Sequence, residues 1–204
     1  MMSEVSKFHF FFQTFSNSAR TGKIAFITDQ DPGTGELVSI DPDLVHEVKK
    51  NSASLTGLST EGAAVEMLQV VSYGIGGQYE PHRDAFGINN VNINVNKDSR
   101  RNFHDEKGDR IATLIYYLED LYPANGGATV FPDLGIAAFP EKGSALFWYN
   151  LHRNGLLHMK SVHAGCPVLH GTKWISNHWF RERNQEFTRP CDIMTDAIDA
   201  STLR

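Results

Sequence analysis

Two residues whose side chains bind metal ions stand two positions apart in His82-Arg-Asp84. If this stretch is a strand, the imidazole and the carboxylate project from one face, because side chains alternate with a period of two. An imidazole beside a carboxylate supplies two of the three ligands of a 2-His-1-carboxylate iron site. The glycines of Gly74-Ile-Gly-Gly77 would allow close backbone approach. The alternative is a solvent-exposed strand end.

The third ligand of such a site would be a histidine from a distant strand. His163, in Ser-Val-His-Ala-Gly-Cys, is our candidate, and His158 and His170 lie near enough in sequence to compete with it. His163 also has an ordinary alternative as a hydrogen-bonded core histidine.

Lys173 is a single cation inside the apolar-patterned segment 172–180. A buried lysine needs a negative partner, because an uncompensated buried charge is costly. The distal carboxylate of a dicarboxylate cosubstrate would be such a partner, whereas an outward-facing charge without function is the alternative. A tight connection at residues 168–171 predicts a hairpin that presents His163 and Lys173 on adjacent strands.

The composition limits the class of protein. The chain has 204 residues, which suits one domain with a sizeable core. A net charge of −5 and a pI of about 6.0 argue against a general binder of nucleic acid or acidic membranes. No apolar run approaches the roughly 18 residues of a membrane helix. Residues 8–12 contain a histidine and no small-residue cleavage site, so we expect no signal peptide.

Helical signals come before strand signals along the chain. Residues 1–40 form a divergent lead-in, with a hairpin-like turn predicted at Asp31–Gly35. Asp41-Pro42 predicts a helix start, which apolar residues at helical spacing continue, and Ser59 or Thr60 predicts a second helix. Strand character begins after Met67, and residues 87–109 predict a long surface loop. Six further strands are expected within residues 111–118, 126–132, 136–139, 144–149, 160–166 and 172–180.

Many short strands with regular turn signals favour a β-sandwich or barrel. We therefore expect a mainly β fold with flanking helices (α+β) and a jelly-roll core over residues 41–191, followed by a polar tail at 192–204. Cys166 and Cys191 are either one disulfide or two unrelated thiols.

From residue 44 to 191 the chain resembles the catalytic domain of collagen prolyl 4-hydroxylase α subunits. Several independent motifs carry the resemblance in the right order: Tyr73-Gly-Ile-Gly-Gly-Gln-Tyr-Glu-Pro-His-Arg-Asp84, Arg110-Ile-Ala-Thr113, Gly126-Gly-Ala-Thr-Val-Phe-Pro132, Lys142-Gly-Ser-Ala-Leu-Phe-Trp-Tyr-Asn150, His163-Ala-Gly-Cys-Pro167, Gly171-Thr-Lys-Trp-Ile-Ser-Asn177 and Glu186-Phe-Thr-Arg-Pro-Cys191. Arg83 departs from the family pattern, which has an aromatic residue between the two ligands.

The resemblance implies a double-stranded β-helix and a role for each matching residue. His82, Asp84 and His163 would hold Fe(II), and Lys173 would bind the far carboxylate of 2-oxoglutarate beside Tyr73. Tyr79, Arg110 and Trp179 match positions that contact the substrate proline or its peptide. Cys166 and Cys191 fall where the family has a disulfide, which implies an oxidising compartment, the lumen of the endoplasmic reticulum.

The implied reaction is hydroxylation of peptidyl proline at C4 in procollagen-type X-Pro-Gly sequences. It would consume O₂ and convert 2-oxoglutarate to succinate and CO₂, with L-ascorbate restoring oxidised iron. Protein disulfide isomerase would be the partner subunit. Two other hypotheses remain: the same chemistry on a different proline-containing protein, and a non-catalytic interaction module that keeps the core.

Overall fold

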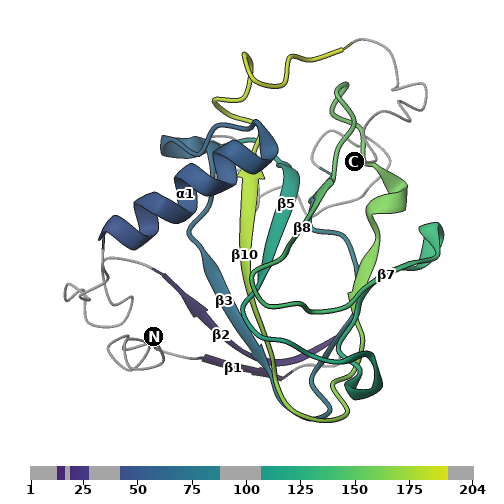
Figure 1. The fold of residues 1–204 in the computed structure, drawn as a ribbon. Helices are drawn as coiled ribbons and strands as arrows, with labels where there is room; N and C mark the ends of the chain where they lie inside the picture. Colours follow the sequence, from purple (N-terminus) through teal and green to yellow (C-terminus); the bar gives the residue numbers. More distant parts are fainter. Residues whose placement is uncertain (1–12, 17–18, 28–41, 88–106, 193–204) are drawn as a thin grey trace.

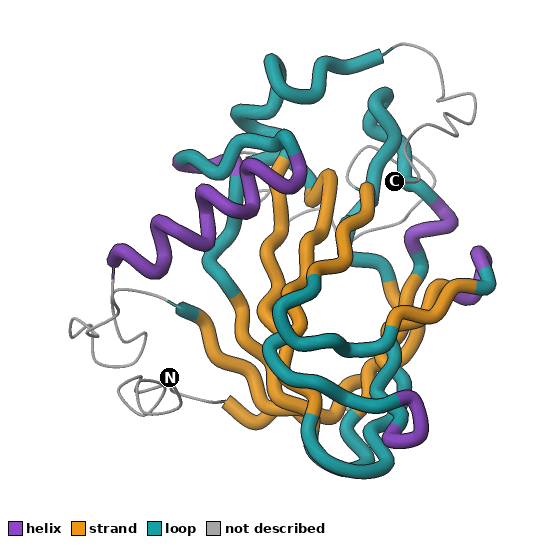
Figure 2. Tube along the Cα trace, viewed as in Figure 1, coloured by secondary structure: helices purple, strands orange, loops and turns teal. Residues whose placement is uncertain are grey.

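The computed structural model describes residues 13–16, 19–27, 42–87 and 107–192 (Figures 1 and 2). These residues form one α-helix, α1 (Pro42–Thr56), and an antiparallel sheet of ten strands. The mainly β prediction is therefore confirmed. The strands are β1 (Gln13–Ser16), β2 (Arg20–Phe26), β3 (Gln69–Tyr73), β4 (Gln78–His82), β5 (Arg110–Tyr117), β6 (Thr129–Phe131), β7 (Ile136–Ala138), β8 (Ala145–Tyr149), β9 (His163–Gly165) and β10 (Lys173–Arg181).

The sheet runs in the order β7-β6-β9-β4-β2-β3-β10-β5-β8, and β1 pairs with β2. It curls into a nearly closed barrel, the double-stranded β-helix that the family resemblance implies (Figure 1). Strand β2 is the link between the two halves, because Lys23–Phe26 pair with β3 and Arg20–Thr21 pair with β4. β1 and β2, inside the predicted lead-in, thus belong to the same sheet.

Successive side chains of strand β10 point alternately into the barrel and toward its outer layer. Lys173, Ile175 and Asn177 face the interior cavity, whereas His178 and Phe180 face away from it. Two apolar clusters follow from this division. The outer cluster includes Leu58, Val65, Leu114, Leu151 and Phe180, and the inner cluster includes Ile24, Val71, Tyr73, Ile115, Tyr117, Leu121, Val168 and Ile175.

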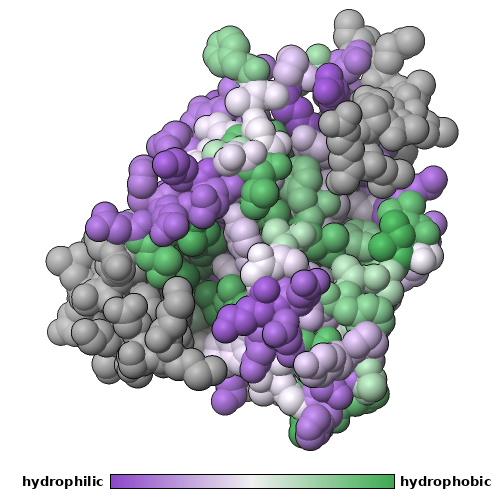
Figure 3. Space-filling view, in the orientation of Figure 1, coloured by the Kyte–Doolittle hydropathy of each residue, from purple (hydrophilic) through white to green (hydrophobic). Residues whose placement is uncertain are grey.

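Helix α1 confirms the start predicted at Pro42, while Asp41 lies outside the described residues. The helix ends where Gly57 takes a positive φ of 71° and its N–H donates to the Ala53 carbonyl, a cap that glycine favours. Its outer surface is hydrophilic (Figure 3). The residue that it buries completely is Ser52, whereas Leu55 is exposed.

The second helix predicted near Ser59 is wrong. Residues Gly62–Ala64 form a single 3₁₀ turn, and Val65 then bridges to Phe180 of β10. The chain turns into the sheet at this point because the Glu66 N–H donates to the Trp179 carbonyl at 2.9 Å.

The predicted hairpin between the strands of His163 and Lys173 is also wrong. β9 pairs with β4 and β6, while β10 pairs with β3 and β5, so β4, β2 and β3 lie between them. The connecting segment forms its backbone bonds with distant turns instead. The Val168 N–H donates to Gly77, its carbonyl accepts from Gly76, and the Leu169 N–H donates to Asn125.

The turn at Asp31–Gly35, most of the loop at 87–109 and all but the first residue of the tail at 192–204 lie outside the described residues. In the part of the chain that is described, no helix is long and apolar enough to cross a membrane.

Candidate active site

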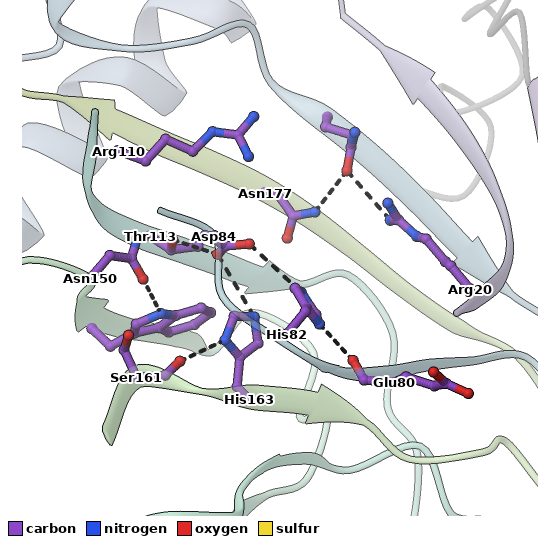
Figure 4. A network of polar contacts seen from close by, with 12 residues as sticks. Arg20, Glu80, His82, Asp84, Arg110, Thr113, Asn150, Ser161, His163 and Asn177 are labelled. Carbon is purple, nitrogen blue, oxygen red and sulfur yellow. Dashed lines mark hydrogen bonds and ion pairs between the residues drawn. The ribbon is translucent and has the colours of Figure 1, made fainter. Parts of the chain in front are cut away.

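The sheet brings three metal-binding side chains to one point. His82 ends β4, His163 begins β9, and the two residues pair directly across these strands. Asp84 follows two residues after β4 ends. His82 Nε2 lies 3.7 Å from Asp84 Oδ1, and His163 Nε2 lies 3.7 Å from Asp84 Oδ2. The ligand atoms of all three lie within 4.8 Å of one another, close enough to share one metal ion (Figure 4).

Both imidazoles are oriented by backbone carbonyl groups. His82 Nδ1 lies 2.7 Å from the Glu80 carbonyl, and His163 Nδ1 lies 2.9 Å from the Ser161 carbonyl. A carbonyl can only accept, so each Nδ1 is the donor, and each Nε2 faces Asp84. Burial, with His163 as a further cause, lowers the pKa of His82 to about 4. Its neutral, metal-binding form is therefore favoured at neutral pH.

A chain of hydrogen bonds holds Asp84 as a carboxylate. Trp148 Nε1 donates to Asn150, Asn150 Nδ2 donates to Thr113, and the Thr113 hydroxyl donates to Asp84 Oδ2 at 2.7 Å. Burial, the largest effect, raises the pKa of Asp84, but His163, His82 and the Thr113 bond outweigh it and hold that pKa below its ordinary value. β5 and β8 supply this chain because Thr113 pairs with Trp148 across them.

Lys173, the first residue of β10, is 3% exposed. Its Nζ donates to Thr129 Oγ1 at 3.1 Å, and the Tyr117 hydroxyl donates to the same oxygen at 2.8 Å. Among the described residues no carboxylate pairs with this ammonium. Burial lowers the pKa of Lys173 to about 8, and Cys166 acts in the opposite direction. Lys173 is therefore a buried cation, as predicted, rather than an outward-facing charge.

The cluster and Lys173 line one cavity of about 310 Å³, a size at the lower end of small-molecule pockets. The other residues predicted for the site line it too. Tyr73 is buried near Lys173, and the Tyr79 ring stacks on His82 with a centroid separation of 3.6 Å. Arg110 lies 3.9 Å from the Trp179 ring centroid. All eight residues predicted for the metal, the cosubstrate and the peptide are thus brought together.

Other polar groups of the cavity wall were not predicted from the sequence. Gln69 Oε1 accepts hydrogen bonds from Arg20 Nη2 at 3.4 Å and from Asn177 Nδ2 at 3.0 Å (Figure 4). Arg20 comes from the predicted lead-in, and its guanidinium lies 4.7 Å from the Tyr79 ring centroid. Glu66 fixes Arg110 by two hydrogen bonds of 2.6 and 2.7 Å. These contacts depend on the pairing of the strands, which the sequence patterns do not specify.

The competing histidines lie elsewhere. His158 stacks on His152 at 4.5 Å, and His170 is exposed. Cys166 and Cys191 are free thiols in the structure, which does not show the disulfide implied by the resemblance, so that pairing stays a prediction.

The donor set fits a ferrous ion and a dicarboxylate. Two imidazoles and one carboxylate are the donor set of the facial triad of non-haem iron oxygenases, which leaves coordination positions open for cosubstrates. The buried ammonium of Lys173 is suited to a carboxylate at the other side of the same cavity. The arrangement can therefore hold a 2-oxo dicarboxylic acid between a metal and a cation.

Comparisons with known proteins agree with this chemistry. The model of the 2OG-Fe(II) oxygenase superfamily matches residues 68–181. Prolyl 4-hydroxylase subunit alpha-2 of Gallus gallus is 43% identical over 83% of this chain and 32% of its own length. Prolyl 4-hydroxylase subunit alpha-1 of Homo sapiens is 41% identical over 88% of this chain and 31% of its own length. The chain thus spans about a third of these relatives.

Two solved structures share the fold. A viral collagen prolyl hydroxylase from Paramecium bursaria Chlorella virus-1, in complex with 2OG, superposes with a TM-score of 0.61, 24% identity and 80% coverage of both chains. A Pseudomonas putida prolyl-4-hydroxylase gives 0.53 with 18% identity, covering 85% of this chain and 78% of its own. The family model spans more than half of the chain and contains every metal-binding residue of the cluster, so this chain belongs to the 2OG-Fe(II) oxygenase superfamily.

Proposed function

We propose that this chain hydroxylates peptidyl proline at C4, in procollagen-type X-Pro-Gly sequences, and converts 2-oxoglutarate to succinate and CO₂. The observation that carries the proposal is that the buried His82–Asp84–His163 cluster and buried Lys173 open onto one cavity. The similarity to prolyl 4-hydroxylase subunits supports peptidyl proline as the substrate class.

Each part of the cavity has a task in this reaction. His82, Asp84 and His163 would hold Fe(II), which with 2-oxoglutarate and O₂ supplies the oxidation of a C–H bond to C–OH. Lys173 would anchor the distal carboxylate of the cosubstrate. Thr129 Oγ1 already accepts two hydrogen bonds, so its own hydroxyl proton can be donated to that carboxylate.

The peptide would enter beside the aromatic and cationic wall of the cavity. The Tyr79 ring, stacked on the ligand His82, would place a proline ring near the metal. Glu66 holds Arg110 against Trp179, so that a rigid guanidinium and an indole face the peptide. Such prepositioned groups orient the reacting C–H bond.

The test measures succinate and hydroxyproline together. Purified chain is incubated with Fe(II), 2-oxoglutarate and ascorbate, with and without a Pro-Pro-Gly repeat peptide. We expect peptide-stimulated succinate and 4-hydroxyproline in equal amounts. His163→Ala should abolish both products while the circular dichroism spectrum is kept, and Lys142→Ala, at an exposed turn, should change neither.

Slow succinate release that no proline peptide stimulates would show an oxygenase with another substrate. Absence of succinate from a folded, metal-binding chain would favour the interaction module instead. Retained turnover in His163→Ala with saturating iron would remove His163 from the ligand set.

A further inference from the structure

Arg83 places an exposed positive charge at the mouth of the cavity. The residue lies between the ligands His82 and Asp84, and its side chain lines the cavity while remaining exposed to solvent. Its Nη1 lies 3.5 Å from Sδ of Met159, the first residue of the 3₁₀ turn Met159–Ser161. A thioether is a weak acceptor and carries no charge, so this contact orients the guanidinium without neutralising it.

The lining of the cavity is cationic although the chain as a whole is acidic. Its described lining residues include four cations, Arg20, Arg83, Arg110 and Lys173, and a single carboxylate, that of Asp84. The whole chain has a net charge of −5. A cleft of one sign attracts ligands of the opposite sign.

Two of these four cations have an anionic partner, because Glu66 pairs with Arg110 at 2.6 Å and the cosubstrate would use Lys173. The Arg20 guanidinium is half-buried and stacks over the Tyr79 ring. The charge of Asp84 would be neutralised by the metal ion. Among the described residues, Arg83 forms no ion pair, so an entering peptide meets its charge first.

We propose that Arg83 selects peptides with an acidic side chain close to the target proline. This inference rests on the proposed prolyl hydroxylation and specifies its substrate class as an acidic, proline-containing peptide. Charge complementarity at an exposed position discriminates between partners by a modest factor. We expect a two- to fivefold preference for acidic over neutral peptides, which weakens as salt is added.

The experiment measures, for each form of the enzyme, the ratio of its activities toward different peptides. A set of equal-length peptides carries one target proline and a Glu, Gln or Lys at each of the flanking positions in turn. The kcat/KM for 4-hydroxyproline is measured for each peptide. Wild type should prefer Glu at one or more positions, Arg83→Gln should lose that preference, and Arg83→Glu should prefer Lys. The ratio between two peptides cancels any general loss of turnover.

Lys142→Gln is the matched control, because it removes one exposed positive charge outside the cavity lining and should keep the preference for Glu. Should an Arg83 variant lose turnover, the ratio of peptide Kd values on its Mn(II)-loaded form serves the same purpose. Hydroxylation by wild type without any charge preference, or a preference that survives in Arg83→Gln, would overturn the role of Arg83 alone. Succinate release without hydroxylation of any peptide would overturn the proposed function and this inference together.

Discussion

The Lys173 side chain is 3% exposed, and its ammonium group donates a hydrogen bond to the Thr129 hydroxyl. Burial is the main cause that lowers the pKa of this ammonium to about 8, so most molecules still carry the proton at pH 7. A bound carboxylate would stabilise the charged form and raise that pKa. Affinity for the dicarboxylate and protonation of Lys173 are therefore linked.

This linkage predicts how the need for 2-oxoglutarate changes with pH. The cation exists below a pKa of about 8 and is lost above it, so the KM for 2-oxoglutarate should rise as the pH increases from 7 to 9. Lys173→Ala should raise that KM about tenfold to a hundredfold at pH 7 and remove this pH dependence, because a hydrogen bond to a charged group contributes about 1.5–3 kcal/mol.

Iron affinity should stay close to that of wild type in Lys173→Ala, since the ligand cluster is untouched. Lys142→Ala serves as a lysine control at an exposed turn. A cosubstrate requirement that does not change in Lys173→Ala would show that another group holds the distal carboxylate.

Residue type and spacing singled out the metal-binding cluster and the buried cation, which the structure brings into one cavity. His82 and Asp84 are near in sequence, and His163 and Lys173 are unusual in their segments. The sequence gives no comparable indication for Thr113, Asn150 and Arg20, because polar residues of these types are common on protein surfaces. Their roles depend on the register that sets Thr113 opposite Trp148 and brings β2 beside β4.

At the scale of elements, a hydroxyl group of α1 joins the helix to the sheet. Ser52 Oγ is fully buried and donates to the Val48 carbonyl at 2.8 Å. Because the hydroxyl proton of Ser52 is used in that bond, Ser52 Oγ acts as the acceptor for the Tyr116 hydroxyl and for His178 Nδ1, both at 2.8 Å. Burial lowers the pKa of His178 to about 4, so a neutral imidazole is the donor. Helix, β5 and β10 thus meet at Ser52.

Replacing this hydroxyl should destabilise the domain without harming the metal cluster. Ser52→Ala leaves the Tyr116 hydroxyl and the His178 N–H with no acceptor, and we expect a loss of about 2 kcal/mol in the free energy of unfolding. Urea unfolding would measure it as a lower midpoint with the same slope. Ser54→Ala, at an exposed position of the same helix, should stay within about 0.5 kcal/mol of wild type. Equal losses in the two variants would contradict this role of Ser52.

The sequence patterns predicted secondary structure correctly where local residues determine it, as for α1 and β5. They were misleading where hydrogen bonds to distant backbone groups determine the conformation. The stretch after Ser59 carries good capping residues, yet Glu66 bonds to Trp179 and ends the helical turn. A tight connection after His163 favours a hairpin locally, but Val168 finds its partners at Gly76 and Gly77.

At the scale of the whole molecule, the curled sheet joins parts of the chain that are far apart in sequence. The metal ligands come from the β4 and β9 side, Lys173 comes from β10, and β2 connects these halves. A ligand that contacts both halves binds the folded sheet and not the unfolded chain. Ligand binding and folding should therefore be coupled.

This coupling predicts that metal and cosubstrate together raise the melting temperature. A ligand at 100 times its Kd stabilises the folded state by about 2.7 kcal/mol, which raises Tm by about 5–10 °C for a domain of this size. Differential scanning fluorimetry with Mn(II), a redox-stable substitute for Fe(II), should show this rise, and EDTA should reverse it. 2-Oxoglutarate should add a further rise when Mn(II) is present. His163→Ala should lose the metal-dependent rise because a ligand is missing, and Lys173→Ala should lose mainly the further rise. Equal shifts in wild type and His163→Ala would mean that Mn(II) binds elsewhere, and the cluster would then not be the metal site.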